Sequence, residues 1–196
     1  MLALIFHRAI LLDEQLSIWM TPTSTDADQK KWPFLPFSWR FALLFLPLIL
    51  VFGGLVALFL PAVGAEQAIG ALLLALIVTT LLSPFWLAAA GTMLPAAAIG
   101  GDARFKAAFR RAKNGYWRTV LRLFLGPILY QIAVIGLLIA VLEPTLEGVW
   151  EQLPVAIELL IYSVIRTLGF VTPLLTATAL SMAYQRSEAV SAQPAP

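Results

Sequence analysis

The chain has 196 residues, of which 60% are hydrophobic and 12% are charged, and its formal net charge is only +2. Soluble domains carry about 25% charged residues, and so short a chain has too much surface for its volume to hide this many apolar side chains from water. The sequence contains no cysteine and a single histidine, which excludes disulfides and thiolate chemistry and disfavours a histidine metal site or a Ser-His-Asp triad.

Residues 1–36 form an N-terminal segment in which apolar and polar runs alternate. Arg8 interrupts the first apolar run and no small-residue cleavage site follows, so we expect the segment to be retained rather than removed as a signal peptide. It is too short to span a bilayer, and we predict a helix that lies on the membrane or against a partner. His7, beside Arg8, is interpreted as an interface residue, and a tetrapyrrole ligand is the alternative.

Four long apolar stretches follow, each long enough for a bilayer core that needs about 20 helical residues. Pro33 and Pro36 should keep the chain extended before the first span. Pro84 should bend the second span, and Gly126-Pro127 should kink the third. The predicted transmembrane helices cover residues 37–60, 67–99, 116–142 and 154–184.

The charges between these stretches indicate a topology. Every lysine and arginine except Arg166 falls before or at the start of the first span, in the loop at 100–118 or the adjoining start of the third span, or after the fourth span. The two other loops hold glutamates, Glu66 in one and Glu147 in the other, and no lysine or arginine. The positive-inside rule therefore predicts an all-α, four-span membrane protein with both termini and the loop at 100–118 in the cytoplasm. The polar residues 187–196 are predicted to be a disordered tail.

A basic segment lies between the second and third spans. The small residues Ala96–Ala98 should lead out of the membrane, and Asp102 can cap a short amphipathic helix at the interface. Basic side chains near an anionic leaflet contribute about 1 kcal/mol each, so we expect lipid headgroup contacts, with an acidic docking partner as the alternative. Nucleic acid is not expected as a partner, because the same side chains lie against the membrane. They are Arg104, Lys106, Arg110, Arg111 and Lys113.

Arg166 lies near the middle of the fourth span, where a charge costs about 2.5–3.5 kcal/mol, so it should face protein or water. Glu158, Tyr162 and Arg166 are spaced by four residues and share a helix face. We favour a structural polar contact to another helix, in this chain or a neighbour, over an ion, proton or headgroup path. Tyr130 and Gln131 are candidate neighbours.

Small residues occur in the first and third spans, where they allow close helix approach inside one bundle or against another subunit. They are Gly53, Gly54, Gly136 and Ala140. Thr79, Thr80 and Ser83, near Pro84, should bond the backbone of their own helix.

Residues 93–100, 105–111 and 115–118, with 172–175 and 183–186, resemble a pattern in poorly characterised bacterial polytopic inner-membrane proteins. The pattern combines a Leu-Pro-Ala span end, a basic amphipathic helix and an aromatic-Arg entry into the next span. These proteins are distantly similar to the membrane domain of glycerophosphodiester phosphodiesterases. The resemblance implies a location in a bacterial inner (cytoplasmic or intracytoplasmic) membrane. It also implies a helical bundle without catalytic residues, since that activity belongs to a separate soluble domain; several of the similar proteins have six spans instead of four.

The sequence shows no phosphate-binding loop, metal-ligand spacing or acid–base set, so we expect no enzymatic activity, cofactor or metal. The favoured function is a non-catalytic accessory subunit that contacts membrane lipids and other integral membrane subunits. Photosynthetic reaction-centre/light-harvesting cores and respiratory complexes are two bacterial settings for such a subunit. A small transporter or channel is the alternative, indicated by Glu158 and Arg166.

Overall fold

The computed structural model describes residues 2–12, 33–62, 67–113, 115–146 and 155–191. The secondary structure of these residues is helical, with no strand among them. In chain order the elements are α1 (Leu2–Leu12), α2 (Phe34–Phe59), a 3-10 turn (Leu60–Ala62), α3 (Ala68–Ala90), α4 (Met93–Ala98), α5 (Phe105–Ala112), α6 (Tyr116–Leu123), a π-helical turn (Phe124–Ile128), α7 (Leu129–Leu146) and α8 (Val155–Ser191).

Four helical stretches are long and apolar enough to cross a membrane, which confirms that part of the prediction. They are α2, α3, the run Tyr116–Leu138 through α6 and α7, and Ser163–Val190 of α8. Large apolar side chains such as Leu50, Leu73 and Leu137 are exposed along them. Such a surface is unfavourable in water and stable in hydrocarbon, so the chain is a multi-pass membrane protein.

Two helix ends differ from the positions expected from the sequence. α2 begins at Phe34, so Pro36 is helical rather than extended. The N–H groups of a first helical turn have no intrahelical acceptor, and a proline there loses no hydrogen bond. At the other end of the chain α8 continues to Ser191, so residues 187–191, expected in a disordered tail, are helical. Residues 192–196 lie outside the described part.

The third span changes its helical geometry at Gly126-Pro127, where we predicted a kink. A π-helical turn covers Phe124–Ile128. Proline has no N–H to donate, and its ring clashes with the carbonyl of a regular α-helix, so a wider turn accommodates it. Pro127 is buried, and α8 packs against this turn.

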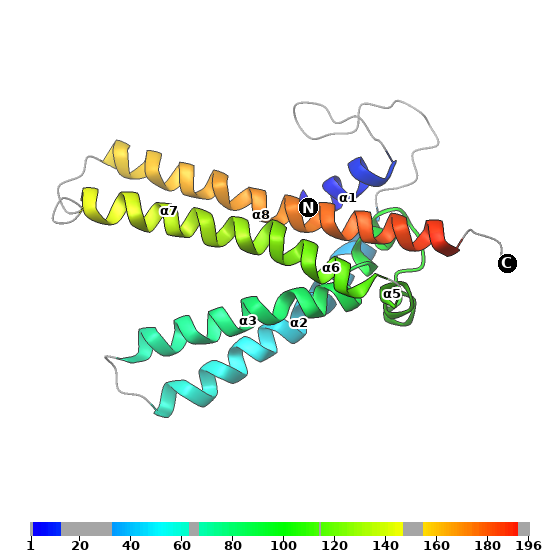
Figure 1. The fold of residues 1–196 in the computed structure, drawn as a ribbon, viewed down its shortest axis with the longest axis horizontal. Helices are drawn as coiled ribbons and strands as arrows, with labels where there is room; N and C mark the ends of the chain where they lie inside the picture. Colours follow the sequence, from blue (N-terminus) through cyan, green and yellow to red (C-terminus); the bar gives the residue numbers. More distant parts are fainter. Residues whose placement is uncertain (1, 13–32, 63–66, 114, 147–154, 192–196) are drawn as a thin grey trace.

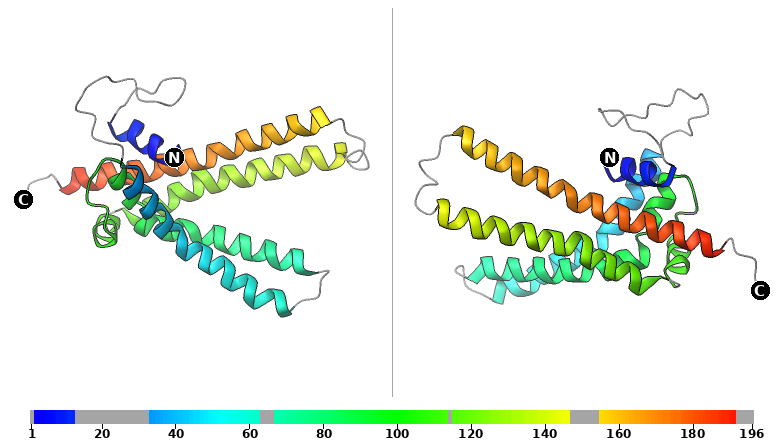
Figure 2. Two further views of the ribbon diagram at one scale, coloured as in Figure 1. Left: turned by 180° about the vertical axis from the view of Figure 1, so that it is seen from behind. Right: turned by 45° about the horizontal axis from the view of Figure 1, so that its top comes forward.

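The helices form two hairpins, α2–α3 and α7–α8, that diverge from a common base (Figure 1). At the base α3 packs against α6, while α8 packs against α6 and α1. Figure 2 shows α1, α4 and α5 grouped there with the C-terminal part of α8. We call this base, including the adjoining ends of α2 and α3, the hub. The diverging parts of the hairpins are the arms.

The buried core lies in the hub. Its largest fully buried side chains include Leu4, Leu44 and Met93, from three different helices. Every residue from Gly91 to Ala98 is buried, and this segment is the centre around which α1, α2 and α8 pack. A Cβ atom at Gly91 would lie 2.6 Å from Leu180 Cδ2, so this approach requires glycine. The exit of Ala96–Ala98 from the membrane stays a prediction.

Candidate functional site: the cleft between the hairpins

A cleft opens where the two hairpins leave the hub. Its main cavity measures about 370 Å³ and is lined from α1, α2, α3, α4, α6, the π-helical turn, α7 and α8. This volume lies in the range of ligand and partner sites, which are concave and largely apolar with a few polar groups. Most lining side chains are apolar, and the polar exceptions are His7, Thr80, Ser83, Gln131, Thr172 and Thr176.

Two further cavities adjoin the main one along the arms. One, of about 370 Å³, follows α2 and α3 past Ile49 and Leu76. The other, of about 380 Å³, follows α7 and α8 past Ile135 and Leu168. Gln131 lines all three cavities, so its side chain marks the point where they meet.

Two hydroxyl groups near the cleft are bonded to helix backbone. Thr79 Oγ1 donates to Ala75 O at 2.8 Å, and Ser83 Oγ donates to Thr80 O at 2.8 Å. Both bonds confirm the sequence prediction for Thr79 and Ser83, whereas the Thr80 hydroxyl forms no hydrogen bond with any described residue. The Gln131 side chain, which is exposed, also forms no hydrogen bond with any described residue.

Each hairpin is tied together internally. Trp86 Nε1 of α3 donates to Leu44 O of α2 at 2.7 Å. The Tyr130 hydroxyl of α7 donates to Leu168 O of α8 at 3.1 Å. The cleft therefore separates two helix pairs, each of which has its own cross-helix bond.

The inner end of the cleft is closed by α1. A 2.7 Å hydrogen bond joins His7 Nδ1 to Ser181 Oγ of α8, and Arg8 donates to Ala98 O of α4 at 3.3 Å. Burial lowers the pKa of His7 to about 3, so the imidazole is neutral near pH 7. His7, interpreted as an interface residue, is thus an internal contact. The sequence signal that could have indicated this contact is the pair of polar residues His7 and Arg8 inside an apolar helix.

The basic segment forms α5, as predicted, but its start differs. The helix begins at Phe105, and Asp102 Oδ1 accepts a hydrogen bond from the Arg104 backbone N at 3.1 Å. Asp102 therefore orders the turn before the helix, where Arg104 holds the N-cap position. The exposed basic side chains here are Arg104, Lys106, Arg110 and Lys113, and their lipid contacts stay a prediction.

Arg111 has a different environment from its basic neighbours. Its Nε lies 2.9 Å from Glu188 Oε1, and its guanidinium sits 4.9 Å from the ring centroid of Tyr184. A further N–H donates to Asp102 O at 2.9 Å. Arg111 thus joins α5 to α8, a role that the sequence did not indicate because Glu188 was placed in the tail.

Glu158, Tyr162 and Arg166 lie along the arm part of α8. Arg166 is exposed, and the side chains of the other two lie outside the described part of the structure. The polar contact expected from their spacing therefore stays a prediction. The acidic loop that contains Glu147 also lies outside the described residues.

The small residues chosen as packing positions face open space. A Cβ at Gly53, Gly54 or Gly136 would meet nothing within 4 Å, and Ala140 is exposed. They do not bring helices of the described chain together. Contact with another subunit, the alternative weighed from the sequence, stays a prediction.

Comparison with protein-family models, curated proteins and solved structures finds no match for this chain. Among the described residues, no group of three or more His, Asp or Glu side chains could hold a metal ion. The fold and the cleft define a class of protein: a multi-pass helical membrane protein whose two hairpins enclose an apolar cleft.

Proposed function

We propose that the protein is a non-catalytic accessory subunit of a larger bacterial inner-membrane complex, and that its cleft receives a transmembrane helix of another subunit. Both termini and the hub lie on the cytoplasmic side in this proposal. The support is that α1 and the end of α8 lie at the same end of the bundle as the basic helix α5 (Figure 1). In this proposal the larger complex is a photosynthetic reaction-centre/light-harvesting core or a respiratory complex.

Gln131 is the observation that carries the proposal. Its carboxamide lies within a predicted membrane span, in an apolar cleft, without a partner among the described residues. Hydrocarbon offers no water to satisfy such a group, so leaving it unpaired is costly. Glutamine side chains in spans commonly hydrogen-bond to a neighbouring helix. A helix of another subunit in the cleft would supply a hydrogen-bond donor or acceptor for the Gln131 carboxamide.

The shape of the cleft also favours a helix. It extends from the hub along both arms, and an α-helix with side chains is about 10–12 Å across. Gly53, Gly54 and Gly136 lie on the arms but line none of the three cavities, so they could serve a second contact outside the cleft, where small residues let another backbone approach closely.

A transporter or channel has less support. A path for ions or polar solutes needs ionisable or densely polar walls. Among the described residues, none of the three cavities is lined by Asp, Glu, Lys or Arg, and His7 is held neutral. Arg166, the feature that favoured transport, is exposed on α8 and lines none of them.

A single introduced cysteine tests the proposal, because the chain has none of its own. We expect Gln131→Cys, labelled with a benzophenone maleimide in native membranes, to cross-link one membrane protein of constant mass, which mass spectrometry would identify. Leu129→Cys is the matched control, since Leu129 is exposed on α7 but lines none of the three cavities. Lipid adducts alone at residue 131 would contradict the proposal.

The Gln131→Leu variant supplies a second measurement. Interhelical hydrogen bonds in membranes contribute about 0.6–1.7 kcal/mol, so we expect the cross-linked partner to co-purify about 3-fold to 20-fold less well. Leu129→Ala should leave the yield of the complex unchanged. Equal loss in both variants would indicate a general effect on the arm rather than a partner at Gln131.

A further inference from the structure

A second, smaller cavity lies in the hub, where α3, α5 and α6 meet the C-terminal part of α8. Its volume is about 30 Å³. Arginine and hydroxyl side chains dominate its polar lining, and no carboxylate lines it among the described residues. The polar side chains are Thr92, Arg111, Thr119, Arg122, Arg186 and Ser187.

Thr92 has an unsatisfied hydroxyl in this cavity. The residue is only 2% exposed, and its Oγ1 finds no hydrogen-bond partner among the described residues. Thr119 and Ser187 already donate their hydroxyl protons, to Gly115 O at 3.0 Å and Tyr184 O at 2.7 Å. A buried, unpaired hydroxyl costs about 1–3 kcal/mol, so the Thr92 hydroxyl is a donor that requires an acceptor.

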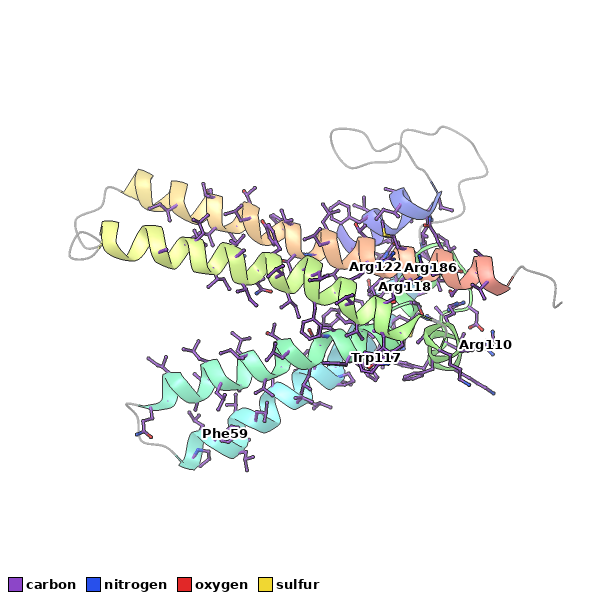
Figure 3. All side chains as sticks on the ribbon, in the orientation of Figure 1. Phe59, Arg110, Trp117, Arg118, Arg122 and Arg186 are labelled. Carbon is purple, nitrogen blue, oxygen red and sulfur yellow. The ribbon has the colours of Figure 1, made fainter. Side chains whose placement is uncertain are left out.

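Two of the three arginines have no ion partner within the described chain, and of these Arg122 is partly buried and Arg186 is exposed. The third, Arg111, is paired with Glu188. Figure 3 shows Arg122 on α6 and Arg186 on α8 close together at the hub, where these helices pack against each other. Two like charges at one cavity repel, and an anion between them removes that cost.

The size of the cavity restricts the anion. One water-sized probe occupies about 10–15 Å³, so there is room for two or three oxygen-sized atoms and not for a sugar or a base. Guanidinium groups bind phosphate oxygens with paired N–H donors, and a hydroxyl adds a third contact. A phosphate group meets these limits if two or three of its oxygens enter the cavity and the rest of the ligand stays outside.

The cavity lies at the same end of α6 as an interface residue. Trp117 at the start of α6 is 72% exposed, as expected for a residue at the membrane interface. We propose that this cavity binds the phosphate of an anionic phospholipid through Arg122, Arg186 and Thr92. The site is independent of a partner in the cleft.

Lipid titration of the detergent-purified protein, followed by native mass spectrometry, tests the proposal. The probe is phosphatidylglycerol, and diacylglycerol without a phosphate is its matched control. We expect Arg122→Gln with Arg186→Gln to weaken phosphatidylglycerol binding at least about tenfold. Arg118→Gln, on the same helix but outside the cavity lining, should change binding less than about twofold. An equal effect of Arg118→Gln would show unspecific charge attraction and overturn the site.

Thr92→Val keeps the shape of the side chain and removes the hydroxyl. We expect phosphatidylglycerol to bind about fivefold more weakly, while the lipid-free protein melts at a higher temperature because an unpaired buried donor is gone. Unchanged binding and unchanged melting would mean that water satisfies Thr92, and the proposal would fail. Binding of inorganic phosphate, without preference for phosphatidylglycerol over diacylglycerol, would overturn the phospholipid assignment.

Discussion

The hub and the arms use the same kinds of residue with opposite results. In the hub Leu44 and Leu180 are at most 1% exposed, whereas Leu50 and Leu137 on the arms are 65% and 63% exposed. Composition cannot separate these leucines, because both pairs lie in apolar helices. The difference lies in the neighbours: α1 and α4 fill the hub, and lipid or another chain must cover the arms. Stability from within this chain is therefore concentrated at one end.

The largest expected effect is the difference in stability loss between two leucine substitutions, one in the hub and one on an arm. Leu180→Ala should lower the free energy of unfolding by about 2–5 kcal/mol, because it leaves a cavity against Gly91 and the rest of the core. Leu137→Ala on the arm should cost less than about 0.5 kcal/mol. Unfolding in mixed detergent micelles measures both. Similar losses for the two variants would refute the division into hub and arms.

Acid should loosen the hub through His7. Its pKa is lowered from 6.5 to about 3 in the folded protein, so between these values only the unfolded state binds the proton. Stability is then complete above pH 6.5 and is lost as the pH falls below it, by about 2 kcal/mol between pH 8 and pH 5.

Hydrogen exchange of α1 in the same pH range would follow this loss directly. His7→Gln removes the titrating group and should flatten the pH dependence, at the cost of a weaker contact with Ser181. A slope that persists in His7→Gln would assign the effect to other groups.

The smallest effect is expected at the rim of the hub. The Glu188 side chain is 49% exposed, and exposed ion pairs contribute about 0–1 kcal/mol. Glu188→Gln should therefore shift the melting temperature by only a few degrees, since Arg111 keeps its bond to Asp102 O and its contact with the Tyr184 ring. If Glu188→Gln lowers stability as much as Leu180→Ala does, the ion pair between Arg111 and Glu188 contributes as much to stability as the buried core, which would contradict this prediction.

The sequence predicted the four spans and the irregular turn at Gly126-Pro127, because hydropathy and proline chemistry are local signals. It did not predict the hub. The bond between His7 and Ser181 joins residues 174 positions apart, and no local pattern reports such a contact. The small residues of α4 indicated an exit from the membrane, although their size is what lets three helices meet. The family resemblance of residues 93–186 stays a prediction.

The cleft could be recognised only in part. Gln131 stands out in the sequence as a polar residue in an apolar span, but the two hairpins that diverge around it are a property of packing at the hub. Thr92 gave no sequence signal at all, because a threonine near a span end ordinarily bonds its own backbone.

Two hydrogen bonds join α1 to α8. The partner of His7 is Ser181, and Gln185 donates to Ile10 O at 3.4 Å. During translation α1 is synthesised before α4 and α8, the two helices against which it packs. It can dock on α4 first, but its bonds to α8 form only when that helix has been made, which at about 5–20 residues per second takes roughly 10–35 s. Throughout that interval the face of α1 that α8 will cover must be sheltered by the insertion machinery or by the bilayer surface.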